Sequence, residues 1–298
     1  MSKTDDARGA QDPPATRHDD LSPTLRRLWG RSEPPRRGPK PALSVEQVVR
    51  AAVELADAEG LAAVSMARVA QVLGYSSMAL YRYVESKEEL LVLMSDAAAD
   101  VLELPPYAEG DWRAGLEGWT RAQIEGVLAR PWFLDLPLTT SQVGPNRLRW
   151  IDQAFAILAP VGLTVDEKLQ VVGLLAQYVL GEGRVQVETR RAAAETVRRA
   201  QGLPEDTPEA ALDERALAAA NPYADYEVVL SRLVDPQAYP ALTAALASWE
   251  PGPAPGGWES DVGFGLDILL DGIEAFVDRR TADRERPGPP RESPGPAR

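Results

Sequence analysis

A run of short, clearly punctuated helical patterns near the N-terminus constrains the fold of this 298-residue chain more than any other feature. Ser44 stands three residues before Gln47, the spacing of a helix capping box, and Gly60 is a typical helix stop. Between them, apolar residues recur at the three- and four-residue intervals of an amphipathic helix: Val45, Val48, Val49, Ala52, Val53, Ala56. This pattern predicts a first helix between Ser44 and Gly60.

Three further helices are predicted at short intervals after the first. One covers residues 65–73 and stops at Gly74, the next covers residues 76–84, and Ser86 caps a fourth that covers Lys87–Val101. A short helix, a turn that contains glycine and a second short helix form a candidate helix-turn-helix, the arrangement that places one helix in the DNA major groove.

The second helix of this candidate has a geometry that suits DNA. At about 100° per residue, Leu80 and Val84 face the core, while Arg82 points almost opposite. The two tyrosines of this stretch, Tyr81 and Tyr83, lie on the flanks. The base-facing edge would present Ser77, Met78, Ala79 and Arg82. Phosphates would be reached by Ser65, Tyr81, Tyr83, Lys87 and the unpaired amides at the start of the Lys87–Val101 helix. The alternative is that one tyrosine is an ordinary core aromatic. Both cannot be, because residues two apart on a helix diverge by about 200°.

Composition excludes several other classes of protein. The chain has no cysteine, so a disulfide framework, a thiolate metal site and a cysteine nucleophile are excluded. Its single histidine, His18, lies in a polar N-terminal stretch, which leaves the folded part without a histidine base or metal ligand. No apolar run reaches transmembrane length and no secretory signal is recognisable, so we expect a soluble cytoplasmic protein that does not bind membranes.

The net charge of −13 argues against nucleic acid as a partner until its distribution is considered. Residues 21–40 hold six basic side chains against Glu33 alone: Arg26, Arg27, Arg31, Arg36, Arg37 and Lys40. A local basic arm can hold phosphates while an acidic body resists nonspecific association. The equally acceptable alternative is a solvated linker.

The rest of the chain reads as helical, and no strand pattern is evident, which predicts an all-α fold. Residues 1–40 are predicted to be a largely disordered tail, with Leu25, Leu28 and Trp29 in a short docked turn, and residues 282–298 a second disordered tail. Between them we expect a DNA-binding domain at 41–90 and a larger helical domain at 102–281. The main helices expected in the latter cover residues 111–130, 147–159, 165–200 (as one helix or two) and 261–280.

The N-terminal region resembles the DNA-binding domain of the tetracycline-repressor (TetR) family of bacterial transcription regulators. The resemblance covers ALSVEQVVRAAVELADAEGLAAVSMARVAQVLGYSSMALYRYVESKEELL, most strongly LYRYVESKEELL. Carried over, the family's base-reading positions fall on Ser77, Met78, Ala79 and Arg82. Its phosphate-contacting positions fall on Ser65, Tyr81, Tyr83 and Lys87, with Arg68 a weaker candidate. Ala79 and Tyr83 depart from residues common in the family, which changes the expected operator sequence more than the binding mode.

The resemblance also implies a homodimer that forms through two late helices of the larger domain, here around Lys168–Glu188 and Asp261–Arg280. The apolar stripe expected in the second of them is Val262, Leu266, Leu269, Leu270, Ile273, Phe276 and Val277. Small residues interleaved with the stripe, such as Gly272, would permit close helix approach. The alternative is a core helix packed within one chain, which periodicity cannot distinguish from an interface.

The family's larger domain binds a small-molecule effector, and aromatic residues gather in the middle of this chain. The candidate ligand contacts are Trp112, Trp119, Trp132, Phe133, Trp150, Phe155 and Tyr178, with Asn146 and Gln177 as polar partners. Each aromatic taken singly is more often a core residue. Tetracycline repressors hold drug and magnesium through histidine, and the folded region here contains no histidine. We therefore expect no metal and no cofactor, but a different hydrophobic or aromatic effector.

The sequence therefore predicts a repressor that a small hydrophobic effector releases from a palindromic operator of double-stranded DNA. One rival is a DNA-binding protein with no effector. A second is a helical enzyme, which we disfavour because the sequence offers no nucleophile–base pair, metal cluster or phosphate-binding loop.

Overall fold

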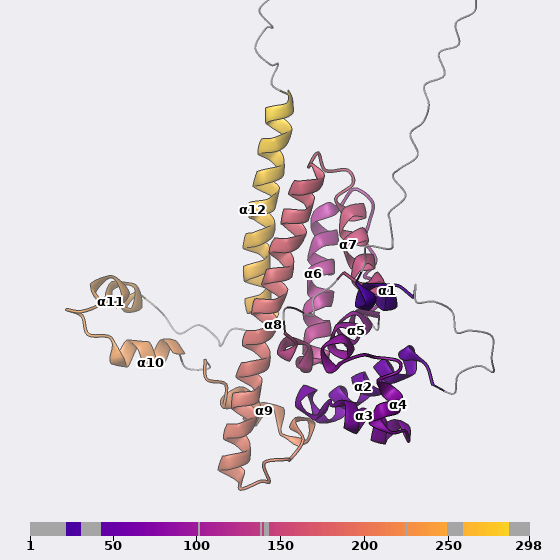
Figure 1. Ribbon diagram of the computed structural model, residues 1–298. Coiled ribbons are helices and arrows are strands. Elements are labelled where there is room, and N and C mark those ends of the chain that lie inside the picture. The colour runs from indigo at the N-terminus through magenta and orange to yellow at the C-terminus, as the bar shows by residue number, and fades with distance from the viewer. Residues whose placement is uncertain are drawn as a thin grey trace, which may run out of the picture. The chain divides into compact units, whose positions relative to one another are not determined.

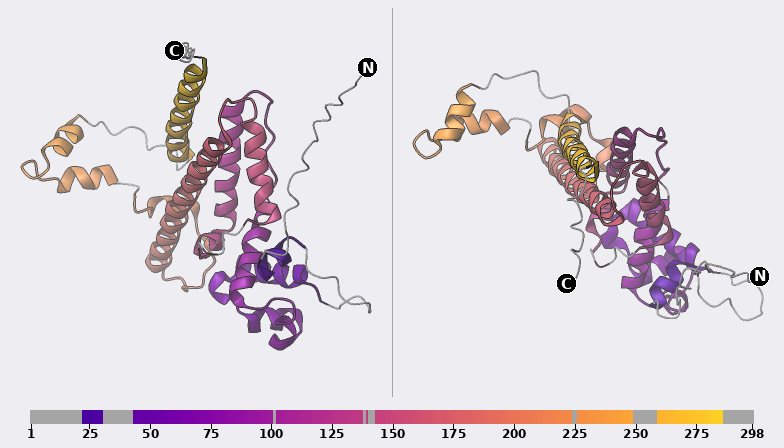
Figure 2. Two further views of the ribbon diagram at one scale, coloured as in Figure 1. Left: turned by 45° about the horizontal axis from the view of Figure 1, so that its top comes forward. Right: turned by 90° about the horizontal axis from the view of Figure 1, so that it is seen from above.

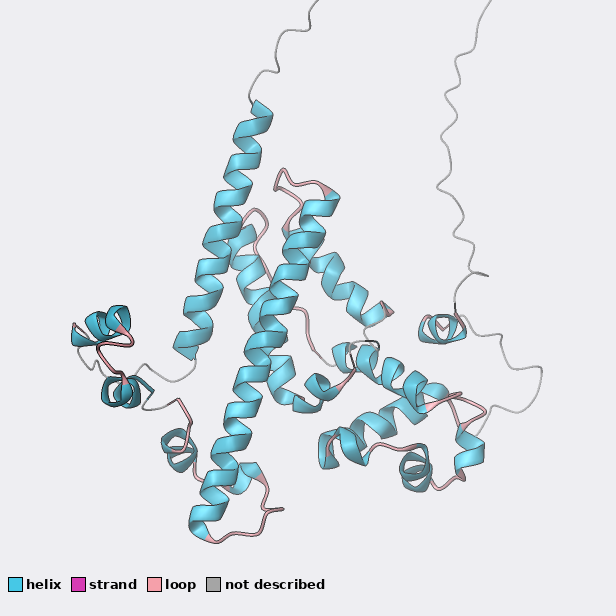
Figure 3. Ribbon diagram, turned by 60° about the vertical axis from the view of Figure 1, so that its left-hand side comes forward, coloured by secondary structure: helices cyan, strands magenta, loops and turns pink. Residues whose placement is uncertain are grey.

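The computed structural model describes residues 22–30, 43–100, 102–137, 139, 143–223, 226–248 and 259–285. Within these ranges all regular structure is helical, as Figures 1 and 3 show, so the all-α prediction is confirmed for the described residues. The chain divides into two compact units. The first runs to Ala98 and includes Pro137–Leu148, and the second holds Ala99–Leu136 and the chain from Arg149 onward. None of the described helices is both long and apolar enough to cross a lipid bilayer.

The first unit contains five α-helices and one short 3-10 helix in its described residues. They are α1 (Pro23–Leu28), α2 (Val45–Glu59), η2 (Leu61–Ala63), α3 (Met66–Leu73), α4 (Ser77–Leu80) and α5 (Lys87–Asp100). The predicted caps hold. Ser44 Oγ accepts from the Gln47 amide at 3.2 Å while the Gln47 side chain accepts from the Ser44 amide at 2.8 Å. Local chemistry therefore determines where α2 begins.

Helix α1 lies inside the N-terminal segment that the sequence indicates as a disordered tail. Ser22 Oγ caps it by accepting from the Leu25 amide at 3.2 Å, and Pro23 occupies its first turn, where a missing amide hydrogen costs nothing. Trp29 follows the helix, and its indole donates to the Val143 carbonyl at 3.2 Å. The expected short docked turn is thus a capped helix, while residues 1–21 and 31–42 of the tail lie outside the described residues.

Helix α4 is shorter than predicted. It ends at Leu80 rather than near Val84, and the following residues form a tight turn in which the amides of Tyr83 and Val84 both donate to the Leu80 carbonyl. The backbone of Tyr81 keeps the right-handed helical conformation. Tyr81, Arg82 and Tyr83 therefore follow α4 instead of lying on it, because hydrogen bonds to the third residue back tighten the end of so short a helix.

The second unit is built on long helices. Its elements, α7 being shared with the first unit, are α6 (Trp112–Ala129), η3 (Pro131–Asp135), α7 (Pro145–Ile157), α8 (Val165–Gln201), η5 (Glu209–Ala211), α9 (Glu214–Ala219), α10 (Tyr226–Leu233), α11 (Pro240–Ala247) and α12 (Glu259–Glu285). Residues 165–201, which the sequence left open as one helix or two, form a single helix. Helix α12 continues four residues past the predicted end of the domain at residue 281, and residues 286–298 lie outside the described residues.

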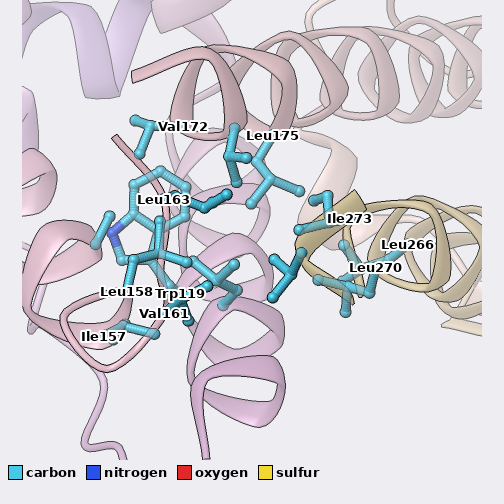
Figure 4. Close-up of a cluster of buried hydrophobic side chains, with 14 of the residues drawn as sticks. Trp119, Ile157, Leu158, Val161, Leu163, Val172, Leu175, Leu266, Leu270 and Ile273 are labelled. Carbon is cyan, nitrogen blue, oxygen red and sulfur yellow. The ribbon is translucent and has the colours of Figure 1, made fainter. Parts of the chain in front are cut away.

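The core of the second unit joins α6, α7, α8 and α12. Helices α8 and α12 run alongside each other (Figure 1, Figure 2), and the buried cluster between the four helices centres on Trp119, Leu175 and Leu270. In Figure 4, Leu266, Leu270 and Ile273 point from α12 into this cluster. Burial of one such leucine contributes roughly 1.5–3 kcal/mol, so this cluster holds α12 against the rest of the unit.

Candidate nucleic-acid interface

The turn between α3 and α4 depends on Gly74. Its φ of 74° is in the left-handed region, where a side chain would be strained, and the Tyr75 amide closes α3 by donating to the Ala70 carbonyl at 2.9 Å. Ser76 Oγ then accepts from the Ala79 amide at 3.3 Å and starts α4. Two caps and one glycine therefore fix the angle between the two helices of the helix-turn-helix.

Two fully buried side chains anchor the segment from Ser77 to Lys87 to the core. Leu80 and Val84 have no exposed surface, as the helical projection predicted, whereas 77% of the Met78 surface and 45% of the Tyr81 surface are exposed. Arg82 and Lys87 are also exposed, while Ser77, Ala79 and Tyr83 are half-buried. The structure therefore places all seven candidate contacts from Ser77 to Lys87 around one short stretch, with the two buried residues holding it from beneath.

Ser65 and Arg68, at the start of α3, already have partners in the protein. Ser65 Oγ accepts from the Arg68 amide at 3.2 Å and so caps α3. The Arg68 guanidinium donates to Glu59 at 2.8 Å and to the Gln71 side chain at 3.0 Å. A phosphate contact from Arg68 would compete with Glu59, which agrees with its standing as the weaker candidate.

The amides at the start of α5, expected to be available for a phosphate, are partly occupied. Ser86 Oγ accepts from the Glu89 amide at 3.1 Å. Hydrogen bonding from its own amide, together with the Ser86 side chain, lowers the pKa of the exposed Glu88 carboxyl. The protein therefore fills this helix terminus with its own side chains, and Lys87 is the candidate phosphate contact that stays exposed there.

Sequence reasoning missed an ion-pair network beside this interface. Arg27 of α1 lies 2.6 Å from the Glu85 carboxylate and also hydrogen-bonds to Glu89, which is buried. Burial would lower the pKa of Arg27, but hydrogen bonds and the charges of the two carboxylates outweigh it and raise that pKa. No periodic pattern could reveal this network, because Arg27 is about sixty residues from both partners along the chain.

The predicted ligand-contacting aromatics divide into buried and half-buried sets. Trp119, Trp132 and Trp150 are buried; the Trp119 indole donates to the Trp150 carbonyl at 2.9 Å, and the two ring centroids lie 6.3 Å apart. The half-buried residues packed against the core are Trp112, Phe133, Phe155 and Tyr178. The three tryptophans thus serve the core, as the alternative interpretation held for each aromatic singly.

The two polar partners predicted for a ligand lie in different surroundings. Gln177 is exposed on α8. Asn146 belongs to the first unit, where its amide donates to the buried Asp96 carboxylate at 3.3 Å. The sequence could not anticipate either position, since the side of α8 that meets the core and the cap of α7 are both decided by packing.

The stripe predicted for dimerisation faces the chain's own core. The buried members are Val262, Leu266, Leu270, Ile273 and Val277, and Leu269 and Phe276 are half-buried. A side chain with no exposed surface offers nothing to a partner, so this face corresponds to the core alternative. The exposed large apolar residues in the described part of the two helices are instead Phe264 and Ile268 on α12, with Val165, Leu169, Leu174 and Val185 on α8.

Comparison with known proteins matches both parts of the chain. Residues 48–94 match the family model described as bacterial regulatory proteins, tetR family. Residues 104–277 match the model described as tetracyclin repressor-like, C-terminal domain. Together these two models span the helix-turn-helix and the long-helix unit.

Individual relatives extend the match over most of the chain. An HTH-type transcriptional repressor from Streptomyces coeruleorubidus, DrrR1, is 34% identical over 265 residues, which is 89% of this chain and 89% of that protein. Among solved structures, apo ActR from Streptomyces coelicolor superposes with a TM-score of 0.61 at 21% identity, covering 81% of this chain and 99% of that one. ActR in complex with actinorhodin gives a TM-score of 0.60 at 22% identity, covering 79% and 97%.

Proposed function

The chain belongs to the TetR family of bacterial transcription regulators, and we propose that it is a homodimeric repressor released from a palindromic operator by a hydrophobic effector. A DNA-binding transcriptional regulator is what the family membership itself establishes. The operator, the dimer and the effector are the parts that we add, and we propose no enzymatic activity.

One observation carries the proposal: the exposed edge that follows the turn at Gly74. Met78 and Arg82 stand exposed over the buried Leu80 and Val84, so both side chains are available to a partner. In the major groove the same edge would meet bases. We assign base reading to Ser77, Met78, Ala79 and Arg82.

Phosphate contacts would flank this reading edge. We assign them to Ser65, Tyr81, Tyr83 and Lys87, with Arg68 contributing only where a phosphate displaces Glu59. Such contacts fix register and orientation without carrying sequence information, so they complement the four base-reading positions.

A homodimer would bring two reading edges onto successive major grooves, about 34 Å apart on a palindromic site. We propose that the partner covers the exposed apolar residues of α8 and α12, with Phe264 and Ile268 at the centre of the contact. Gly272, on α12, has open space where a Cβ would stand, which permits close approach of another helix. This proposed interface lies on the side of α12 opposite the buried stripe, which the sequence predicted as the dimer contact.

We propose a hydrophobic, aromatic effector in the second unit, contacted by the half-buried Trp112, Phe133, Phe155 and Tyr178. Support comes from their packing against an apolar core and from ActR, a fold relative solved with actinorhodin. Effector binding can release DNA only in proportion to its preference for one state of the dimer. A DNA-binding protein without an effector remains the second candidate.

The test begins with the DNA. Genomic fragments retained by the purified protein are sequenced, footprinted and used in gel-shift assays, and we expect a site with two related halves. Small aromatic compounds are then screened by thermal shift. A compound that both stabilises the protein and weakens the operator complex supports the effector; none in a broad library supports the second candidate. Absence of any retarded fragment at modest ionic strength would contradict DNA binding.

A further inference from the structure

The Arg27 guanidinium bridges two carboxylates, one in the turn after α4 and one in the first turn of α5. Its Nη2 lies 2.6 Å from Glu85 Oε1, and its Nη1 hydrogen-bonds to Glu89 Oε2. The Arg27 side chain is only 19% exposed and that of Glu89 only 4%. This contact fastens α1 to the turn before α5 across about sixty residues of sequence.

The buried Glu89 carboxylate depends on this cation. Its Oε2 also accepts from the Glu85 amide at 2.6 Å, whereas Oε1 is buried without a hydrogen-bond partner among the described residues. A buried carboxylate that loses its cation is strongly disfavoured, and the surrounding chain rearranges to hydrate it. Arg27 therefore stabilises the charged form of the Glu89 carboxylate. Through Glu89 it also stabilises the conformation of the Glu85 backbone.

The position of this ion-pair network matters because Glu85 lies between Tyr83 and Lys87. Both of these residues are assigned to phosphates in the proposed function. Without Arg27, two carboxylates would face the same region as the incoming phosphates, and like charges there oppose association. With Arg27 in place, one of these two negative charges is offset.

A second contact holds the same C-terminal end of α1 within the unit. The Trp29 indole bonds to the Val143 carbonyl, and the chain just beyond it is held by Asp96 of α5, which accepts from the Arg147 amide at 3.0 Å. Gly144 allows this close approach, since a Cβ there would stand 2.2 Å from the Asp96 carboxylate. Helix α1 is therefore attached at two places and cannot shift without disturbing the start of α5.

We propose that Arg27 is a positioning residue for DNA binding. By pairing with Glu85 and Glu89 it holds Tyr83 and Lys87 in place and reduces repulsion of the DNA backbone, while its own guanidinium does not contact DNA. The inference rests on the proposed function, because it takes Tyr83 and Lys87 as phosphate contacts.

The experiment measures operator affinity of the full-length protein by fluorescence anisotropy, well below each variant's melting temperature. Arg27→Ala should weaken binding by about tenfold, which corresponds to about 1.4 kcal/mol. Arg26→Ala, on the exposed side of the same helix, is the matched control and should stay within about twofold of wild type, the scale of a single distant surface charge.

Rescue separates positioning from direct contact. In the triple variant Arg27→Ala, Glu85→Gln, Glu89→Gln the carboxylates no longer need a cation, so most of the lost affinity should return. Hydrogen exchange at the Glu85 amide should accelerate in Arg27→Ala and slow again in the triple variant. A loss that the neutral partners do not restore means that Arg27 touches DNA itself and overturns the proposal, as does an equal loss in Arg26→Ala.

Failure of this inference is distinguishable from failure of the proposed function. If Lys87→Ala weakens binding and folded Arg27→Ala does not, the inference alone is overturned. If wild-type protein retains no operator, the DNA-binding assignments are overturned with it. Should Arg27→Ala fail to fold, Glu89→Gln in the wild-type background takes its place, and unchanged affinity and unchanged exchange at Glu85 would then overturn the inference.

Discussion

Helices α4 and α12 were both predicted from spacing to carry a functional face, and the structure treats them differently. In α4 and its following turn, the two core residues Leu80 and Val84 are buried, and the remaining residues form the candidate DNA interface. In α12, the stripe predicted to meet a second copy meets α6, α7 and α8 of the same chain. The exposed apolar residues of α12 lie on the opposite face.

The difference lies in what kind of residue carries the function. Burying Leu80 and Val84 leaves Met78, Tyr81 and Arg82 outside the core, where their side chains are available to a partner. An apolar stripe such as that of α12 is satisfied equally by an intrachain core and by a dimer interface. Periodicity therefore identifies an apolar face but not the surface that covers it.

The strongest test of this comparison is to shorten one side chain of the buried stripe. Leu270→Ala should lower the free energy of unfolding by about 2–5 kcal/mol, because it leaves a cavity among α6, α8 and α12. Urea denaturation followed by circular dichroism measures the change. A variant with wild-type stability that only dissociates into monomers would return the stripe to the dimer interface.

The exposed face of α12 supplies the complementary prediction. Phe264→Asp should weaken the dimer by about 2–4 kcal/mol, as expected for a central apolar contact replaced by a charge, while leaving the helical content unchanged. Sedimentation equilibrium measures the dissociation constant. The matched control is Val229→Asp on α10, which is also exposed and should not alter association; equal effects of both substitutions would contradict the assignment.

On the DNA-binding side, Arg82→Ala should reduce discrimination at one operator position by about 1–3 kcal/mol, the value of one bidentate contact to a base. Binding to an operator set with each base pair changed in turn measures this loss. Equal weakening on every duplex would show that Arg82 contacts the backbone and not a base.

Lys87→Ala should weaken binding to all duplexes alike, by about 0.5–1.5 kcal/mol at moderate salt. Because each phosphate contact releases about one counterion, the slope of log affinity against log salt should also fall by about one. Titrations at several salt concentrations measure the slope, with Lys168→Ala in the second unit as the control. An unchanged slope would remove Lys87 from the phosphate contacts.

The smallest expected effect concerns a surface ion pair in the second unit that no apolar pattern marks. A hydrogen bond from Arg190, 2.6 Å from the Glu214 carboxylate, lowers the pKa of Glu214 below 4.5. Its stabilising contribution is present above pH 4.5 and is lost as the pH falls through the lowered pKa. Melting temperature should therefore fall less steeply with acidification in Glu214→Gln than in wild type; identical slopes would show that the pair contributes nothing.

The sequence by itself determined the local structure of this protein. Ser44, Ser65 and Ser86 are helix caps, and Gly60 and Gly74 are helix stops, because capping hydrogen bonds and left-handed or otherwise strained backbone are properties of a few neighbouring residues. Helix α4 is shorter than the spacing predicts, because hydrogen bonds to the Leu80 carbonyl tighten the chain after it into a turn.

Only the tertiary structure decided which surfaces meet. It placed the stripe of α12 in the core, left Phe264 and Ile268 exposed, and brought Arg27 onto Glu85 and Glu89. Side chains distant in sequence meet only after the chain has closed loops between them, and the spacing of residues along a helix contains no information about that closure. Local hydrogen bonding thus sets where each helix lies in the sequence, and packing sets what each helix face contacts.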